Sequence, residues 1–254
     1  IYFRYSPENN LWNSTDRWKR IIPNINKKTL ISVCLISLNK AIENFLNKNS
    51  LNVKLHLIAD NSNQEFDNQI MKLINTKKID VIKHNSKIKG NRGSYLECCD
   101  QAENAEDLIF FVEDDYLFEE HSINECMLTY SRISSLLETE IILCPSDYPF
   151  FYDSLYKTSL FIGNKHRWRN VGETLLTFMF SKIIFKKYKK EIREVGEKIN
   201  DPFEKPLHSI YKKAICLAPI NSLSYHISRS VPDIDNDWKK LWEINYARLL
   251  KLKS

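Results

Sequence analysis

The 254-residue sequence predicts a single α/β domain in which helices cover both faces of a mostly parallel sheet. Three observations support this prediction. Short apolar segments alternate with longer amphipathic ones, as expected of successive βαβ units. The strand-like segments are apolar throughout, which is typical of strands buried on both faces of a parallel sheet. No Pro-, Gly- or Ser-rich linker divides the chain, so both halves belong to one domain.

The first half of the chain, residues 30–118, predicts repeated strand–helix units. The predicted strands are Leu30–Ser37, Val53–Ala59, Asp80–Lys83 and Asp107–Val112. The predicted helices are Lys40–Lys48, Gln64–Asn75 and Gly93–Ala105. Residues 1–29, which are polar with scattered aromatic side chains, are expected to form an N-terminal extension before the sheet.

The second half, residues 119–234, continues the same domain with a weaker alternation. We expect a helix over Ile123–Leu137, a strand over Glu140–Cys144, a strand-like segment over Thr174–Phe180 and a long amphipathic helix to about Ile199. Residues 235–254 predict a C-terminal amphipathic helix that carries two Trp among basic side chains. Such a helix either packs on the domain or lies on an anionic membrane surface.

Composition and charge exclude several classes of protein. The chain has 37 Lys and Arg against 32 Asp and Glu, a net charge of +5, and 43% of its residues are hydrophobic. A disordered chain is thereby excluded, and the modest, mixed charge argues against nucleic-acid binding while permitting an anionic ligand. The six cysteines lack zinc-site spacing, and neither a secretory signal nor an apolar run of about 18 residues is recognised, so we expect a cytoplasmic protein.

The segment FVEDDY carries the strongest chemical signal. Three consecutive carboxylates follow a fully apolar strand, and a divalent cation is the usual way to relieve their repulsion. Glu113 and Asp115 point the same way in an extended strand end, and their oxygen ligands suit Mg²⁺ or Mn²⁺. Asp60 follows an earlier strand at the same edge of the sheet, where open α/β sheets bind ligands. The alternative is a solvated acidic turn or the first turn of a helix.

The order of these segments resembles the nucleotide-sugar-binding half of GT-A-fold glycosyltransferases, particularly those of family 2. The resemblance covers residues 30–118 and rests on TLISVCLIS, LHLIADNSN, KGNRGSYLECCDQA and DLIFFVEDDY. It implies a GT-A-like, Rossmann-like fold in which Asp60 contacts the nucleoside while Glu113 and Asp115 bind Mn²⁺ or Mg²⁺ and the donor diphosphate. LAPINSLSYHIS resembles the closing strand of this family, which implies His226 as a metal ligand. Further donor-binding residues implied by the resemblance are Ser37, Asn39, Asn91, Gly93 and Asp114.

A basic stretch in the second half offers cations for the departing diphosphate. Lys165, Arg167 and Arg169 are the candidates. A solvated basic loop is the equally weighted alternative.

An inverting transfer also needs a general base near the acceptor hydroxyl, and carboxylates are the usual choice. Family 2 places this base in a Glu-Asp pair at the start of a helix. The best match is DPFEK, where Glu204 fits and Lys205 replaces the aspartate. Glu173 and Asp147 are the other candidates, because both follow segments expected to line the acceptor pocket. For each carboxylate the alternative is a helix cap or a turn.

The resemblance implies a metal-dependent, inverting glycosyltransferase that moves a sugar from a nucleoside diphosphate sugar to an acceptor glycan or glycolipid in surface polysaccharide biosynthesis. A lipid-linked acceptor would place the protein at the inner face of a membrane. Two alternatives remain open: a sugar nucleotidyltransferase and a non-catalytic nucleotide-sugar-binding module. The nucleotidyltransferase usually has a Gly-rich loop after its first strand, whereas SLNKAIENF after the predicted first strand contains no glycine.

Overall fold

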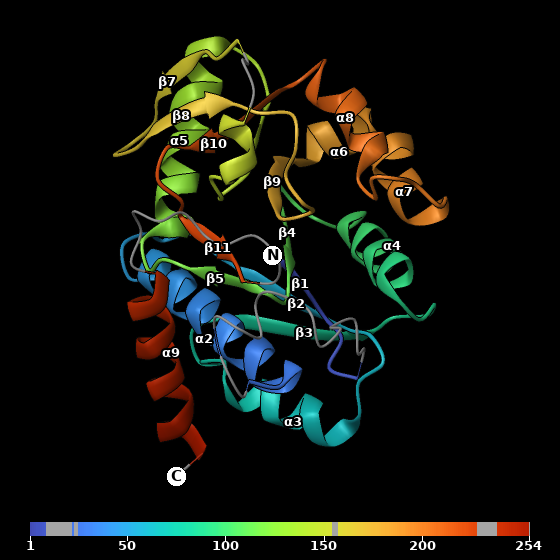
Figure 1. Ribbon diagram of the computed structural model, residues 1–254, viewed down its shortest axis with the longest axis vertical. Helices are drawn as coiled ribbons and strands as arrows, with labels where there is room; N and C mark the ends of the chain where they lie inside the picture. The colour runs from blue at the N-terminus through green and yellow to red at the C-terminus, as the bar shows by residue number, and fades with distance from the viewer. Residues whose placement is uncertain (9–21, 23–24, 154–156, 228–237, 254) are drawn as a thin grey trace.

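The computed structural model describes residues 1–8, 22, 25–153, 157–227 and 238–253, and its central feature is one large sheet (Figure 1). Within the described residues the strand order is β3-β2-β1-β4-β9-β6-β10-β8-β7. The strands of this sheet are β1 (Tyr2–Tyr5), β2 (Lys54–Ala59), β3 (Asp80–Asn85), β4 (Leu108–Glu113), β6 (Ile141–Leu143), β7 (Leu160–Ile162), β8 (Arg167–Asn170), β9 (Phe178–Ser181) and β10 (Ile215–Pro219). A second, small sheet pairs β5 (Tyr116–Phe118) with β11 (Ser224–His226).

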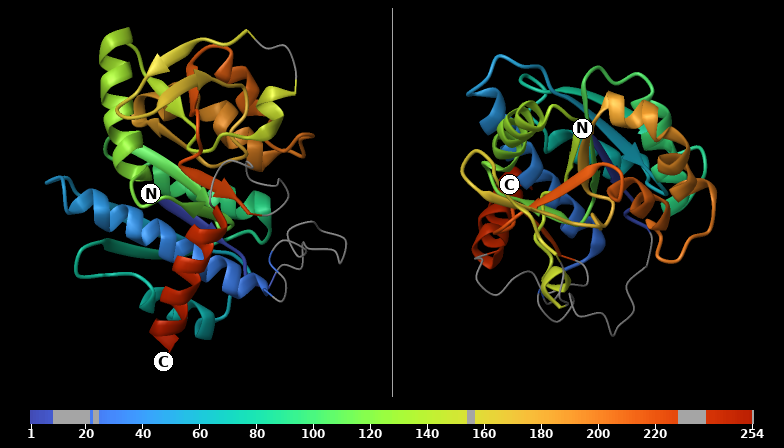
Figure 2. Two further views of the ribbon diagram at one scale, coloured as in Figure 1. Left: turned by 60° about the vertical axis from the view of Figure 1, so that its left-hand side comes forward. Right: turned by 90° about the horizontal axis from the view of Figure 1, so that it is seen from above.

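Helices cover both faces of the large sheet, with α2 and α5 on one side and α4 and α7 on the other (Figures 1 and 2). The α-helices are α2 (Lys27–Leu46), α3 (Gln64–Lys72), α4 (Asn91–Ala102), α5 (Ser122–Leu137), α6 (Lys182–Lys187), α7 (Lys189–Glu197), α8 (Lys205–Tyr211) and α9 (Trp238–Lys253). A short 3₁₀ helix, η1, spans Pro149–Tyr152. The predicted single-domain α/β class is therefore confirmed.

The sheet is parallel in its first half and mixed in its second. Strands β3, β2, β1 and β4 run parallel. Strand β9 then lies antiparallel between β4 and β6, and beyond it β6 and β10 pair in parallel. Strands β8 and β7 continue the sheet as an antiparallel hairpin. Antiparallel pairs are thus more frequent in the second half than a mostly parallel sheet predicts.

Two predictions for the N-terminal region are wrong. Residues 2–5, placed in an extension, form β1 between β2 and β4, in the parallel half of the sheet. The run Leu30–Ser37, predicted as the first strand, lies inside helix α2. Asn26 caps this helix, its side chain accepting a hydrogen bond from the Thr29 backbone N–H at 2.8 Å.

Helix α2 is apolar on nearly all sides because it is buried on two faces. Leu35 and Leu38 belong to the main core, whereas Val33 and Cys34 pack in a second cluster with α9. Among the described residues it is the one helix long and apolar enough to cross a membrane, and 72% of its most apolar stretch is buried within the fold. An apolar run of this kind does not distinguish a buried strand from a buried helix.

The C-terminal helix packs against the domain. Trp238, Leu241, Trp242 and Leu249 of α9 are buried in the cluster that α9 shares with α2. Figure 2 shows α9 lying across α2 on the outside of the fold. The aromatic face that a membrane surface would contact is therefore covered by protein. The predicted helix ending near Ile199 is divided at Tyr188 into α6 and α7.

Candidate metal and sugar-nucleotide site

The order of the strands places a switch point at the carboxyl ends of β1 and β4. The chain leaves β1 for β2 and β3 on one side, and returns to β4 on the other side of β1. In an open α/β sheet, ligands bind outside the carboxyl ends of the strands at such a switch point. Ser6, Asp60 and the Glu113–Asp115 segment follow β1, β2 and β4 directly, so they lie at this edge.

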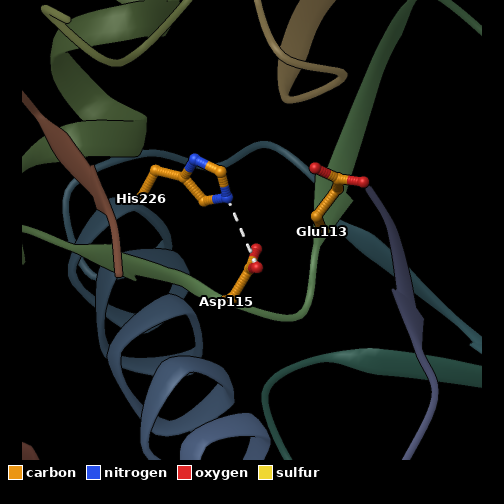
Figure 3. A group of neighbouring side chains, drawn as sticks. All are labelled: Glu113, Asp115 and His226. Carbon is orange, nitrogen blue, oxygen red and sulfur yellow. Dashed lines mark ion pairs between the residues drawn. The ribbon is translucent and has the colours of Figure 1, made fainter. Parts of the chain in front are cut away.

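Glu113, Asp115 and His226 converge at this edge (Figure 3). Glu113 ends β4, Asp115 lies in the turn to β5, and His226 ends β11. One ligand atom from each of the three lies within 4.8 Å of the others. Nε2 of His226 is 3.3 Å from Oδ2 of Asp115, and the imidazole stacks on the Tyr116 ring with 4.7 Å between centroids. Two carboxylates and an imidazole fit a divalent cation such as Mn²⁺ or Mg²⁺.

The predicted convergence depends on antiparallel pairing between distant segments. In the small sheet His226 lies opposite Tyr116, and the backbone N–H of Ile227 donates to the carbonyl of Asp115 at 2.9 Å. This pairing holds the His226 ring beside the acidic turn.

Two cations balance the acidic residues. The buried guanidinium of Arg4 on β1 forms an ion pair with Glu113 and donates to the side-chain oxygen of Asn91. Lys27 at the start of α2 forms an ion pair with Asp114 at 2.6 Å, and the backbone N–H of Ser6 donates to the same carboxylate at 2.9 Å. Asp114 is therefore held by protein groups, while the neighbouring Asp115 faces His226.

The electrostatics of the cluster favour an added positive charge. Burial raises the pKa of Glu113 to about 7, Arg4 opposes this rise, and Asp115 adds to it. Burial opposes protonation of His226, but the Asp115 carboxylate outweighs it and raises the pKa of His226 above its ordinary value. Carboxylates that hold protons this strongly in the free protein exchange them for a cation when a metal binds.

Three donor residues implied by the resemblance lie at the same edge. The Asp60 carboxylate accepts from the Gly90 backbone N–H at 3.0 Å and from the Ser6 hydroxyl at 3.2 Å. Asn91 and Gly93 lie in the first turn of α4. A Cβ on Gly93 would lie 1.8 Å from the Ile88 carbonyl oxygen, so this position requires glycine.

Ser37 and Asn39 have structural contacts within helix α2 and do not follow a strand end. The Ser37 hydroxyl donates to the Cys34 carbonyl at 2.6 Å and accepts from the Phe118 backbone N–H at 2.9 Å. The Asn39 side-chain oxygen accepts from the Asn75 backbone N–H at 3.3 Å. Their assignment to donor binding rested on a strand that the structure shows to be a helix.

The second-half basic residues are not brought to the cluster. Arg167 and Arg169 lie on β8, four strand spacings from β4 in the sheet order, or about 19 Å at about 4.8 Å per strand. Arg169 forms a buried ion pair with Asp147 at 3.2 Å, and the Tyr152 hydroxyl donates to Asp147 at 2.5 Å. Arg167 is exposed and lines a separate cavity of about 450 Å³ with Lys165.

Glu173 and Glu204 lie together in the second half. Glu204, at the start of α8, is buried and accepts from the Thr174 backbone N–H at 3.2 Å and the Thr174 hydroxyl at 3.1 Å. Glu173 precedes that threonine, and 35% of its side chain is exposed. Burial raises the pKa of Glu173, and the charge of Glu204 raises it further.

A strained turn lies between these carboxylates and Glu113. Leu175 and Leu176 both have left-handed backbone conformations, with φ of 46° and 62°. Thr174 on one side of them contacts Glu204, whereas the hydroxyl of Thr177 on the other side accepts from the backbone N–H of Glu113 at 3.2 Å. The left-handed conformation costs free energy for a bulky residue such as leucine. Strain of this kind concentrates at functional sites.

Sequence reasoning missed three residues of these clusters: Arg4, Lys27 and His208. Arg4 could have been noticed as a cation within the aromatic segment YFRY. Four residues are, however, too few to predict a central strand. Lys27 and His208 carry no recognisable local motif.

No protein-family model matches the chain, and no curated protein sequence matches it. Solved structures similar to it include residues 1–349 of S. aureus TarS, with 10% identity and a TM-score of 0.49. That similarity covers 88% of this chain and 59% of the TarS chain, so the present chain spans less than two thirds of it. Another is the inositol-1-phosphate CTP transferase from T. maritima, with 13% identity, a TM-score of 0.44, and coverage of 98% of this chain and 95% of that one.

Proposed function

We propose that the protein is a metal-dependent glycosyltransferase that transfers a sugar, with inversion, from a nucleoside diphosphate sugar to a glycan or glycolipid hydroxyl. The observation that carries this proposal is the convergence of Glu113, Asp115 and His226 at the switch point of the sheet. A divalent cation held by these three residues would neutralise the charge that develops on the leaving diphosphate. Asp60, Asn91 and Gly93 would contact the donor beside it.

Glu173 is the carboxylate best suited to act as the general base. Asp147 is held in its ion pair with Arg169, and Glu204 is buried against Thr174. Glu173 is partly exposed and lies next to the turn that contacts Glu113. The acceptor oxygen would attack the anomeric carbon as the bond from that carbon to the diphosphate breaks, and the hydroxyl proton would pass to Glu173.

The neighbouring carboxylates Glu173 and Glu204 favour a glycosyltransferase over a nucleotidyltransferase. A phosphate nucleophile is already ionised at neutral pH, whereas a sugar hydroxyl needs a base such as Glu173. The segment that follows the observed first strand, SPENNLWNSTDRWKR, also contains no glycine, so it lacks the Gly-rich loop that is usual in a nucleotidyltransferase.

The proposal is tested by thermal unfolding with UDP-, GDP-, CMP- and dTDP-sugars, each with Mn²⁺, with Mg²⁺ and with a chelator. We expect one nucleotide class to raise the melting temperature only when a metal is present, because a ligand that binds the native state stabilises it. Turnover is followed as released nucleotide. Stabilisation by nucleoside triphosphates with release of pyrophosphate would instead identify a nucleotidyltransferase. A folded protein that no nucleotide stabilises would contradict both functions.

A Glu173→Gln variant is expected to separate binding from chemistry. Glutamine keeps the shape of the side chain but cannot accept the hydroxyl proton, so turnover should fall by about 10²- to 10⁴-fold. The metal-dependent rise in melting temperature should remain, because Glu173 is not one of the three proposed ligands, Glu113, Asp115 and His226. If Glu173→Gln turns over at the wild-type rate, another residue is the base. If wild-type protein binds the donor without turnover, the chain is a binding module.

A further inference from the structure

His208 lies close to two carboxylates, those of Glu173 and Glu204. It is on helix α8, one turn after Glu204, and its Nε2 is 3.7 Å from Oε1 of Glu173 and 3.9 Å from Oε1 of Glu204. This nitrogen atom is buried and has no hydrogen-bond partner within the described residues. A single imidazole nitrogen therefore faces both carboxylates at ion-pair distance, without being committed to either.

The two carboxylates differ in their freedom to move. Glu204 accepts from both the backbone and the hydroxyl of Thr174, and that hydroxyl also lies 2.8 Å from the Tyr211 hydroxyl. Glu204 is thus a fixed negative charge inside the protein. Within the described part of the chain, His208 is the one ion-pair partner of Glu173, whose side chain is partly exposed. The imidazole is therefore well placed to restrain Glu173.

The charges that surround His208 decide its protonation. Its interaction with the Glu204 carboxylate raises the pKa of His208 above the ordinary value, burial opposes this rise, and the charge of Glu173 adds to it. The charge of Lys212, which follows the last residue of α8, lowers the pKa of His208. The carboxylates outweigh both opposing effects, so the imidazolium persists to higher pH than in an isolated histidine.

Glu173 needs this cation, because burial and the charge of Glu204 both favour its protonated form. His208 is the group that opposes them. A protonated carboxyl cannot accept a proton from an acceptor hydroxyl.

We infer that His208 is a positioning residue whose imidazolium, held by the fixed charge of Glu204, keeps Glu173 ionised and oriented as the base. This inference rests on the proposed function for its catalytic meaning, but the charge relationship exists with or without turnover. The acceptor proton passes from the hydroxyl oxygen to an oxygen of Glu173, and His208 remains protonated throughout. The loss of activity at low pH then follows the protonation of Glu173, which the charge of His208 shifts to lower pH.

The first test measures the two groups directly. The metal-free protein, with ¹³C-labelled glutamate carboxyls and ¹⁵N-labelled histidine rings, is titrated by NMR, and Glu173→Gln identifies the Glu173 signal. We expect His208 to titrate above 6.5, and His208→Gln to raise the midpoint of Glu173 by about one pH unit, as expected on loss of an adjacent opposite charge. His208→Lys, which keeps a cation, should restore most of the wild-type midpoint.

The matched control is His166→Gln. His166 is also partly buried, and its Nδ1 lies 3.6 Å from the carboxylate of Glu125, but it belongs to the β7–β8 turn. This variant should leave the Glu173 titration unchanged. An unchanged midpoint in folded His208→Gln protein, or wild-type His208 that titrates at or below 6.5, would refute the inference. Binding of Zn²⁺ that is lost in Glu204→Gln would also refute it, by assigning the cluster to a cation.

The second test is the pH profile of nucleotide release from the donor that stabilises the protein. Loss of the His208 charge should move the acid limb to higher pH, because more alkaline conditions are needed to ionise Glu173, and His208→Lys should move it back. A shifted NMR midpoint without turnover by any variant would overturn the proposed function and leave the charge relationship established. Turnover with identical acid limbs in wild type and His208→Gln would overturn the inference alone.

Discussion

An Asp115→Asn variant is expected to lose both the metal-dependent thermal stabilisation by the donor and its turnover. Asp115 supplies the carboxylate 3.3 Å from His226, and a neutral amide neither balances a divalent cation nor binds it comparably. Loss of a residue that merely orients a metal ligand costs about 10- to 100-fold in metal affinity, so loss of a ligand should exceed about 100-fold. Calorimetric titration with Mn²⁺ measures the affinity, and thermal unfolding with donor measures the linked stabilisation.

Glu125→Gln is the matched control for this experiment. Glu125 is buried even more deeply than Asp115, but it accepts from the backbone N–H groups of Lys165 and His166 in another part of the domain. This variant should be less stable and should still bind Mn²⁺ and donor. Wild-type metal affinity in Asp115→Asn would show that the cluster is not the metal site.

An Arg4→Met variant is expected to unfold at markedly lower denaturant concentration. Arg4 is 5% exposed and balances Glu113, so its removal leaves a largely buried carboxylate without its cation. Breaking a buried ion pair by removing one partner costs about 3–5 kcal/mol, and the partial exposure of Glu113 points to the lower end. For a chain of this size, about 3 kcal/mol lowers the melting temperature by about 6–12 °C. Urea unfolding of the metal-free protein at pH 9, above the pKa of Glu113 of about 7, measures the loss.

A second substitution separates charge from packing. If the loss arises from the unpaired carboxylate, Arg4→Met combined with Glu113→Gln should recover much of it. The matched control is Lys28→Met, which removes an exposed ion pair with Glu8 and should change the free energy of unfolding by less than about 1 kcal/mol. An Arg4→Met protein as stable as wild type would show that Glu113 is neutral or solvated in the folded state.

The sequence predicted strands β2, β3, β4, β6 and β9, misread the beginning of the sheet, and did not predict β7 or β8. Val53–Ala59 and Asp107–Val112 are flanked by polar residues at both ends, so their extent is clear, and they appear as β2 and β4. Leu30–Ser37 is apolar because α2 is buried against both the sheet and α9, and periodicity cannot detect this second partner. Strand β1 was not predicted, because a four-residue segment that includes an arginine resembles an exposed segment.

The candidate site was predicted where local sequence carries the chemistry. FVEDDY indicated Glu113 and Asp115, and the resemblance of LAPINSLSYHIS to a family closing strand implied His226. The structure brings these three side chains together. Long-range pairing could not be predicted from the same information. Arg169 was expected at the donor diphosphate, but it lies beside Asp147, because β8 joins the far side of the sheet. The charge of an arginine does not by itself predict which carboxylate will be its ion-pair partner.

The pairing of β11 with β5 has a consequence for how the protein is made. His226 follows Asp115 by roughly 110 residues in the chain, so at about 5–20 residues per second a ribosome would add it roughly 5–20 s later. During that interval the acidic turn has Arg4 and Lys27 available, but not its imidazole. The nascent chain therefore carries an incomplete ligand set, and it acquires the third ligand only when most of the domain has been synthesised. Under the proposed function, metal binding therefore has to wait until β11 has been synthesised and has paired with β5.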